Sequence, residues 1–123
     1  MLNRYHKKVF TTAEHWEKLK SLTNRLNVMK WSYSIHSLDN LRHRIIGIES
    51  ILRFIKNTVL DYNTIFEYYL NNNEPEKICY RLNYNSDVDL ILVLSNTKNI
   101  ITIYINEKND NHLTLNKNLY RLQ

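Results

Sequence analysis

KICYRLNY, residues 77–84, is the stretch that decides the fold, because its large apolar side chains recur at every second position. A period of two is typical of a strand with one buried face and one polar face. Further apolar runs, at residues 65–70, 88–94 and 100–106, are separated from it and from each other by short polar segments rich in asparagine. These spacings predict consecutive hairpins, with residues 88–94 as a fully buried central strand.

Two amphipathic helices are expected before the strands. The first has Thr11 or Thr12 as its cap and continues to about Val28, because apolar residues step by three or four along one stripe. This stripe consists of Trp16, Leu19, Leu22, Leu26 and Met29. A stronger pattern of the same kind predicts a second helix over residues 38–57, in which Gly47 is either tolerated or splits the helix in two. Residues 31–36, between the helices, suit an extended linker or a short strand.

The fold class that follows is α+β, with two N-terminal helices packed on one face of a three- to four-stranded antiparallel meander. Residues 1–123 are expected to form a single domain, since this length is ordinary for one hydrophobic core. Because the chain has only one glycine, its tight turns are expected to use asparagine, which tolerates the left-handed backbone conformation.

Positive charge is concentrated in the first half of the chain. Residues 1–60 carry eleven of the seventeen Lys and Arg residues, four acidic residues and four of the five histidines. Residues 61–123 carry six basic and eight acidic residues. A basic surface attracts polyanions, so RNA is the expected partner, ahead of an anionic membrane. The candidate nucleic-acid contacts are Lys18, Lys20 and Arg25 on the first helix and Arg42 and His43 on the second.

Several kinds of site are excluded by the residue types. One glycine is too few for a P-loop or a dinucleotide-binding loop. The histidines form no HExxH motif and no Cys/His cluster, so no metal and no cofactor are expected. The single cysteine, Cys79, cannot form an internal disulfide, and no apolar run approaches the roughly 20 residues that span a bilayer. A cytoplasmic protein without membrane contact is therefore expected.

The first group of candidate catalytic residues surrounds the start of the second helix. His36 precedes this helix, where an imidazole can bind a phosphate or act as a general base. Arg44, on the helix, can stabilise the pentacovalent phosphate that forms when a 2′-oxygen attacks its own 3′-phosphodiester. The alternative is that these side chains belong to a solvated helix face without a catalytic role.

The second group of candidates belongs to the last strand and the segment after it. In residues 100–106 the period of two places Thr102 and Tyr104 on one face with Asn106, and three isoleucines, Ile101, Ile103 and Ile105, on the other. Tyr104 is a candidate base-stacking platform or proton donor, although the same face is also compatible with ordinary sheet surface. His112, in the segment that follows, is a candidate second acid or base.

Part of this pattern resembles a known group of domains. His36, Arg44 eight positions later, the pair Gly47-Ile48 and the apolar helix that follows resemble the opening helix of small bacterial toxin-like domains. Those domains are grouped with the RelE-type, barnase, EndoU and colicin ribonucleases. The similarity covers roughly residues 34–106, with Asn40 where that group usually has its first arginine. It implies metal-independent RNA cleavage and a cognate inhibitor protein.

The leading hypothesis is a toxin-type ribonuclease, bacterial or phage-encoded, that cleaves RNA by 2′-oxygen attack. His36 acts as base or phosphate ligand in this hypothesis and Arg44 as the clamp, with Thr102, Tyr104 and His112 completing the site. The alternative is a non-catalytic module that binds nucleic acid or protein, such as a phage inhibitor of a host nucleoprotein. A third possibility is an accessory protein whose basic face meets an acidic partner.

Overall fold

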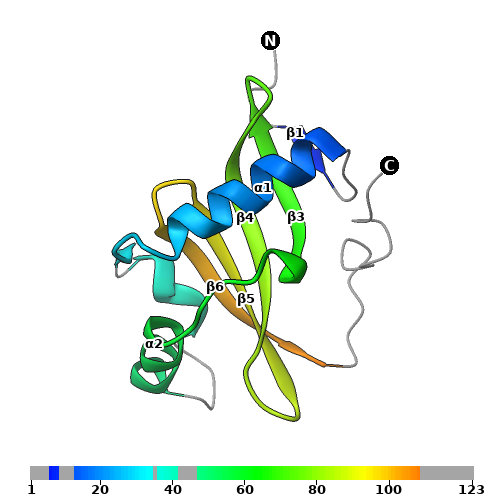
Figure 1. Cartoon of the computed structure of the whole chain (residues 1–123). Coiled ribbons are helices and arrows are strands. Elements are labelled where there is room, and N and C mark those ends of the chain that lie inside the picture. Colours follow the sequence, from blue (N-terminus) through cyan, green and yellow to red (C-terminus); the bar gives the residue numbers. More distant parts are fainter. Residues whose placement is uncertain (1–5, 9–12, 35, 42–46, 109–123) are drawn as a thin grey trace.

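One twisted sheet with helices on one side forms the part of the chain that is described, residues 6–8, 13–34, 36–41 and 47–108 of a computed structural model (Figure 1). The centre of the sheet is an antiparallel meander of β3 (Ile65–Asn71), β4 (Glu74–Asn83), β5 (Val88–Ser95) and β6 (Asn99–Glu107). The prediction of an α+β fold built on consecutive hairpins is therefore confirmed.

The sheet is wider than the three or four strands predicted. Its described strands follow the order β1-β3-β4-β5-β6-β2, in which β1 (His6–Lys8) pairs antiparallel with β3. At the other edge β2 (Ser32–Tyr33) pairs parallel with β6, which makes the sheet mixed. Residues 31–36 therefore contain a short strand. Neither edge strand is longer than three residues. Such a short strand does not show the alternation of apolar and polar residues from which a strand is predicted.

Two of the three described residues with positive φ are the asparagines of the β3–β4 turn. Asn72 and Asn73 have φ of 55° and 64°, as a two-residue hairpin loop requires. The third is Lys98, with φ of 64°, in the turn before β6, where asparagine was expected. Lys98 is anchored there: its Nζ donates to the Met29 carbonyl at 3.0 Å and lies 4.3 Å from the centre of the Trp31 ring. These contacts of the side chain offset the backbone strain.

The first helix, α1 (Ala13–Leu26), buries Leu19, Leu22 and Leu26 against the sheet, as its stripe predicts. It ends at Leu26, earlier than the predicted Val28, and the side chain of the next residue, Asn27, forms two hydrogen bonds with the backbone of Leu60. This polar junction leaves Met29 beyond the helix and 37% exposed.

The prediction of one continuous helix over residues 38–57 is wrong. A 3-10 helix, η1 (His36–Leu41), precedes the short helix α2 (Ile48–Lys56). Gly47 is the N-cap of α2 with φ −69° and ψ 146°, an extended conformation that breaks the helical path. The structure therefore agrees with the other prediction, in which the helical pattern breaks at Gly47. A further single turn, η2 (Tyr62–Thr64), is capped by Asp61 before β3 begins.

One large core lies between the helices and the sheet. α1, α2 and η1 all contribute side chains to it, and the strands contribute alternate residues such as Tyr68, Tyr80 and Leu92. A buried hydrogen bond of 2.9 Å joins the Thr23 hydroxyl of α1 to the Tyr80 hydroxyl of β4. Because buried polar groups are costly when unpaired, this bond fixes the position of α1 along the sheet.

The face assignment of β6 needs one correction. The pairing of β5 with β6 shifts between Val93 and Leu94, which face Thr102 and Ile100, and this places a bulge at Ile101 of β6. Ile100 is therefore 2% exposed and in the core, whereas Ile101, expected there, is 37% exposed. Beyond the bulge the predicted alternation holds, with Ile103 fully buried under the helices.

Replacing Tyr80 with Phe is expected to lower the free energy of unfolding by about 1–2 kcal/mol, because the Thr23 hydroxyl loses its partner in the core. The double variant Tyr80→Phe/Thr23→Val is expected to recover part of this loss, since both polar groups are then gone. Urea unfolding of the wild type, both single variants and the double variant measures the coupling. Strictly additive effects would contradict the assigned role of this bond.

Candidate functional site

The face of the sheet opposite α1 and α2, here called the second face, carries a compact cluster of its own. Its centre consists of Phe66, Cys79, Ile91 and Val93, with Tyr69 and Tyr104 packed against them. Polar and charged side chains surround this centre. Strand pairing aligns the polar and the apolar residues of this face in rows across the strands. One row is Glu67–Cys79–Val93–Thr102, and the next is Arg81–Ile91–Tyr104.

Glu67 is the most unusual residue of the second face, because it is an acidic residue that is only 8% exposed. The Tyr69 hydroxyl donates to Glu67 Oε2 at 2.7 Å, and the Cys79 thiol donates to the same oxygen at 3.8 Å. The pKa of Tyr69 lies far above its usual range. Burial is the largest cause, and the hydrogen bond to Glu67 is the next. The phenol therefore keeps its proton at neutral pH. Lys77 Nζ lies 4.7 Å from the centre of the Tyr69 ring and adds a cation.

Tyr104 shares this electrostatic environment. Burial raises the pKa of the Tyr104 hydroxyl, and the neighbouring Cys79 and Glu67 raise this pKa further. Arg81 acts on the pKa of Tyr104 in the opposite direction, as a nearby cation must. A carboxylate, two protonated phenols and two cations therefore occupy one face of the four neighbouring strands β3 to β6.

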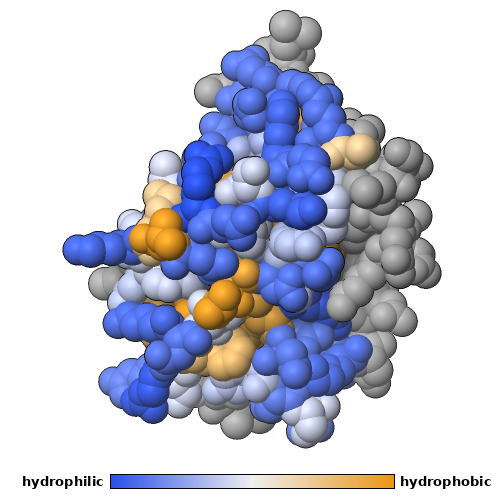
Figure 2. All heavy atoms as spheres, viewed as in Figure 1, coloured by the Kyte–Doolittle hydropathy of each residue, from blue (hydrophilic) through white to orange (hydrophobic). Residues whose placement is uncertain are grey.

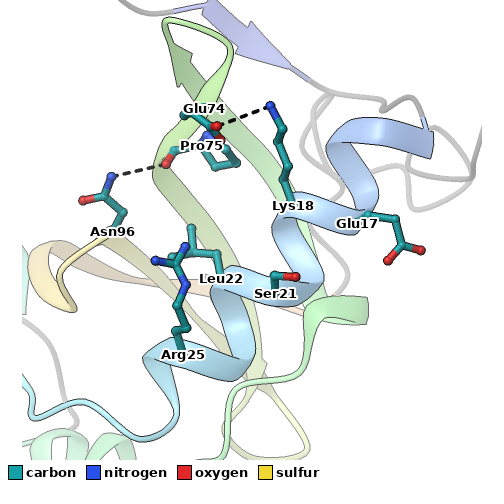
Figure 3. Close-up of a pocket in the computed structure, with 8 residues that line it drawn as sticks. All are labelled: Glu17, Lys18, Ser21, Leu22, Arg25, Glu74, Pro75 and Asn96. Carbon is teal, nitrogen blue, oxygen red and sulfur yellow. Dashed lines mark hydrogen bonds and ion pairs between the residues drawn. The ribbon is translucent and has the colours of Figure 1, made fainter.

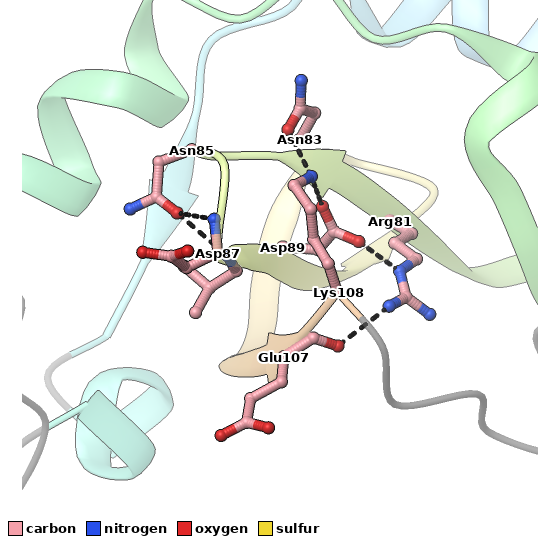
Figure 4. Close-up of polar contacts among 8 residues, drawn as sticks. Arg81, Asn83, Asn85, Asp87, Asp89, Glu107 and Lys108 are labelled. Carbon is pink, nitrogen blue, oxygen red and sulfur yellow. Dashed lines mark hydrogen bonds and ion pairs between the residues drawn. The ribbon is translucent and has the colours of Figure 1, made fainter.

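Arg81 is held in place by a charged network at one end of the second face (Figure 4). Its Nε donates to Asp89 Oδ2 at 2.5 Å, and its Nη2 donates to the Glu107 carbonyl at 3.3 Å. Lys108 Nζ donates to the other oxygen of Asp89 at 2.6 Å and to Asn83 Oδ1. Burial alone raises the pKa of Asp89, but the hydrogen bonds from Lys108 and Arg81 outweigh it, so this pKa lies below its usual value.

The described part of the chain brings together only two of the predicted catalytic residues. Thr102 and Tyr104 both belong to the second face, as predicted. His36 is exposed at the start of η1, and Leu38 of the same helix packs into the core on the other side of the sheet. His36 is therefore not part of the cluster around Tyr104. Four predicted site residues, Arg42, His43, Arg44 and His112, lie outside the described residues.

The predicted nucleic-acid contacts on α1 lie beside acidic groups. Lys18 and Arg25 line a cleft of about 490 Å³ between α1 and the β3–β4 hairpin, together with Glu17 and Glu74 (Figure 3). Lys18 Nζ lies 3.5 Å from Glu74 and 3.7 Å from Glu14, and it donates to the Asn73 carbonyl at 2.9 Å.

Lys20, the remaining predicted contact on α1, is also paired. Its Nζ lies 3.5 Å from Glu17 and 5.4 Å from the centre of the Tyr62 ring. Exposed pairs of this kind are weak, but the acidic partners lower the positive potential on which phosphate attraction depends. The α1 surface is thus a mixed-charge surface, and Arg25 is the one predicted contact on it for which no ion pair is seen among the described residues.

Glu67, Tyr69, Lys77 and Arg81 are the residues that sequence reasoning missed. The alternation of residues 77–84 did place Lys77, Cys79 and Arg81 on one side, which was the available signal. Glu67 and Tyr69 could not be assigned in the same way, because β3 has register shifts between Ile65 and Glu67 and between Tyr69 and Leu70. A bulge moves side chains to the other face without changing the sequence pattern.

Comparison of the chain with models of known protein families, with curated proteins and with solved structures found no match. The resemblance to ribonuclease toxins therefore stays a prediction. Within the described ranges, no group of three or more metal-binding side chains comes together. The helices in those ranges are all too short or too polar to cross a membrane.

Replacing Asp89 with Asn is expected to lower the free energy of unfolding by about 2 kcal/mol at pH 7, because two charge-assisted hydrogen bonds weaken. The pKa of Asp89 is depressed in the folded state, so its contribution is complete above the unfolded-state pKa of about 3.9 and is lost as the pH falls further. The difference between variant and wild type should therefore shrink below about pH 4 in chemical unfolding experiments.

Asp87→Asn is the matched control, since Asp87 is exposed two positions earlier in the chain. This control should change stability by less than about 0.5 kcal/mol at either pH. Equal losses in both variants would contradict the role assigned to the Asp89 network.

Proposed function

We propose that the protein cleaves RNA without a metal ion, by attack of a ribose 2′-oxygen on the adjacent phosphodiester, and that the second face carries the reaction. The observation that supports this most is the buried Glu67 carboxylate, which accepts a hydrogen bond from Tyr69 and lies on the same face as Lys77 and Arg81. General acid–base catalysis on a phosphodiester needs an acceptor, a donor and a cation close together.

Each of these groups has a role in the proposed reaction. Glu67 accepts the proton of the attacking 2′-hydroxyl. Tyr69, whose raised pKa keeps it protonated, donates a hydrogen bond or proton to the leaving 5′-oxygen. Arg81 binds the phosphate with its planar guanidinium and stabilises the charge that develops on the pentacovalent phosphate. The products are a 2′,3′-cyclic phosphate and a 5′-hydroxyl.

The surrounding residues fit recognition and positioning. Tyr104 is half-buried beside Arg81, where its ring is able to stack on a base. Thr102 lies next to Val93 in the neighbouring row and adds a hydroxyl. Asp89 and Lys108 hold Arg81 by the contacts described above and act as positioning residues. Compared with the hypothesis from the sequence, the reaction is the same, but Glu67 takes the place of His36.

The toxin character and a cognate inhibitor protein remain part of this proposal. Their support is the resemblance of residues 34–106 to toxin-like ribonuclease domains. Arg44 and His112, which the sequence predicts as clamp and as second acid or base, lie outside the described residues, and in this proposal Arg81 takes the role of the clamp.

The test uses labelled single-stranded RNA with EDTA present and follows both cleavage and the chemistry of the new ends. Wild-type protein is expected to produce 2′,3′-cyclic phosphates and to leave an oligonucleotide without the 2′-hydroxyl uncut. Glu67→Gln and Arg81→Lys are each expected to lower the rate about 100- to 1,000-fold, which is typical for the loss of one catalytic donor or acceptor.

Glu74→Gln and Arg25→Lys are matched controls on the opposite, helix-covered side, and each should change the rate less than about threefold. Circular dichroism checks that all variants are folded. Intact RNA at micromolar wild-type protein would rule out the proposed reaction, and equal effects in both pairs of variants would rule out the second face as its site.

A non-catalytic binding module is the second candidate, and exposed apolar side chains favour it. Val28 and Val59 are 87% and 79% exposed and flank the Asn27–Leu60 junction. Figure 2 shows hydrophobic residues among the hydrophilic ones on this helix-covered side. A protein partner recognised there should bind with little salt dependence, and Val59→Asp should weaken the complex. Steep weakening between low and moderate salt would instead indicate nucleic acid.

A further inference from the structure

One face of α2 borders a second cleft, of about 560 Å³, on the helix-covered side of the sheet. Ser50, Arg53, Phe54 and Asn57 line it from the helix, and their spacing places all four side chains on the same helix face. Tyr84, the residue after β4, lines it from the sheet. A cleft of this volume is in the usual range for a small-molecule site.

Phe54 and Tyr84 give this cleft an aromatic wall. Their ring centres lie 5.0 Å apart at an interplanar angle of 70°, which is an edge-to-face contact. Both rings pack against the large core, yet both are only half-buried, so part of each ring faces the cleft. The core therefore holds the rings in place, and a flat ligand is able to stack on them without a rearrangement.

The polar side chains of the cleft divide into two groups. Two of them are bound to the helix itself: Asn57 Nδ2 donates to the Arg53 carbonyl at 3.0 Å, and the Thr58 hydroxyl donates to the Phe54 carbonyl at 2.7 Å. For the Ser50 hydroxyl and the Arg53 guanidinium, by contrast, no hydrogen bond or ion pair is seen in the described part of the chain. A hydroxyl and a planar cation are thus available to a ligand.

The charge around the cleft favours an anion. Arg53 and Lys56 belong to the last turn of α2, whereas the acidic residue of this helix, Glu49, belongs to the first turn. No acidic residue of the described ranges lines the cleft. The cleft along α1 differs in this respect, because Lys18 is paired there with Glu74. A guanidinium binds a phosphate through two parallel hydrogen bonds, so Arg53 is suited to a phosphate group.

We propose that this cleft binds a nucleotide, with the base stacked on the wall formed by Phe54 and Tyr84 and the phosphate bound by Arg53. A nucleotide is the class of ligand that joins a flat aromatic ring to an anion. Ser50, one helical turn before Arg53, donates a further hydrogen bond to the phosphate. A free mononucleotide and one nucleotide of an RNA strand share this chemistry.

The cleft is separate from the residues to which RNA cleavage is assigned. Tyr84 packs against the core on the helix-covered side, whereas Tyr69 and Tyr104 pack on the second face. Asn83, next to Tyr84 in the chain, accepts a hydrogen bond from Lys108 of the second-face network. An RNA strand on the second face would therefore reach the cleft around this end of β4. Only this source of the nucleotide rests on the proposed function.

The test is chemical-shift mapping by NMR on the full-length protein with uridine 5′-monophosphate. This ligand is expected to shift the signals of Ser50, Arg53 and Tyr84 together, with a Kd of about 1 mM or below. Uridine lacks the phosphate and ribose 5-phosphate lacks the base. Each is expected to bind at least about tenfold more weakly, because each loses one of the two contacts.

Two variants separate the contributions of the base and the phosphate. Arg53→Gln is expected to weaken binding of the monophosphate at least about tenfold, and Tyr84→Leu at least about fivefold. Arg25→Gln is the matched control, since Arg25 is an exposed arginine of α1 for which no ion pair is seen among the described residues either. This control should stay within about twofold of the wild type. Circular dichroism checks the fold of each variant.

A 2′-O-methyl hexanucleotide, which is not cleaved, distinguishes the two sources. If the nucleotide belongs to an RNA strand, the hexanucleotide shifts Tyr84 together with Tyr104, and Arg53→Gln weakens its binding at least about threefold. If the nucleotide is free, the hexanucleotide leaves Tyr84 unshifted while the monophosphate still binds there. Both results support a nucleotide site in the cleft.

Three results would overturn the inference. Unshifted signals of Ser50, Arg53 and Tyr84 up to about 20 mM monophosphate would mean that no such site exists. Equally tight binding of uridine would mean that Arg53 does not bind the phosphate. Equal weakening by Arg53→Gln and Arg25→Gln would reduce the effect to unspecific charge attraction. None of these results bears on cleavage at the second face, which the RNA assay with the Glu67 and Arg81 variants tests.

Discussion

β5 is buried on both of its faces, and the rest of the structure is arranged around this constraint. Leu90, Leu92 and Leu94 point to the helix-covered side, whereas Ile91 and Val93 point to the second face. A strand without a polar face has to lie in the interior of its sheet and has to be covered twice. The hairpins on either side of β5 satisfy the first requirement, and the helices satisfy the second on one side only.

The helical layer is fixed by a few polar contacts at defined places. The hydroxyls of Thr23 and Tyr80 form a hydrogen bond inside the core. Where α1 ends, the side chain of Asn27 forms hydrogen bonds with the backbone N–H and carbonyl of Leu60. Apolar packing is tolerant of small shifts, whereas these hydrogen bonds are satisfied in one arrangement only. The contacts between the helices and the sheet are thus specialised for stability. On the second face, by contrast, a carboxylate, two phenols and two cations are held close together, which is chemistry that a structural surface does not require.

Sequence reasoning recovered the elements whose pattern is local. The alternation in residues 77–84 and the leucine stripe of α1 correspond to β4 and to the buried face of that helix. Four features depended on non-local structure and were missed. They are the edge strand β1, the parallel pairing of β2 with β6, the bulge at Ile101, and the proximity of Glu67 to Cys79. Cross-strand register decides such proximity, and a one-residue shift sends a side chain to the other face. Thr102 and Tyr104, two positions apart on one strand, were therefore recognised as candidates, whereas the neighbours of Tyr104 on other strands, Glu67 and Arg81, were not.

The central claim is that RNA meets the protein on the second face and not on the basic residues of α1. Chemical-shift mapping by NMR with a 2′-O-methyl RNA, which binds but lacks the attacking hydroxyl, tests this claim most directly. The account predicts perturbations at Tyr69, Arg81 and Tyr104 that saturate together, with small changes at Lys18 and Arg25. Perturbations confined to α1, or none up to millimolar RNA, would contradict it.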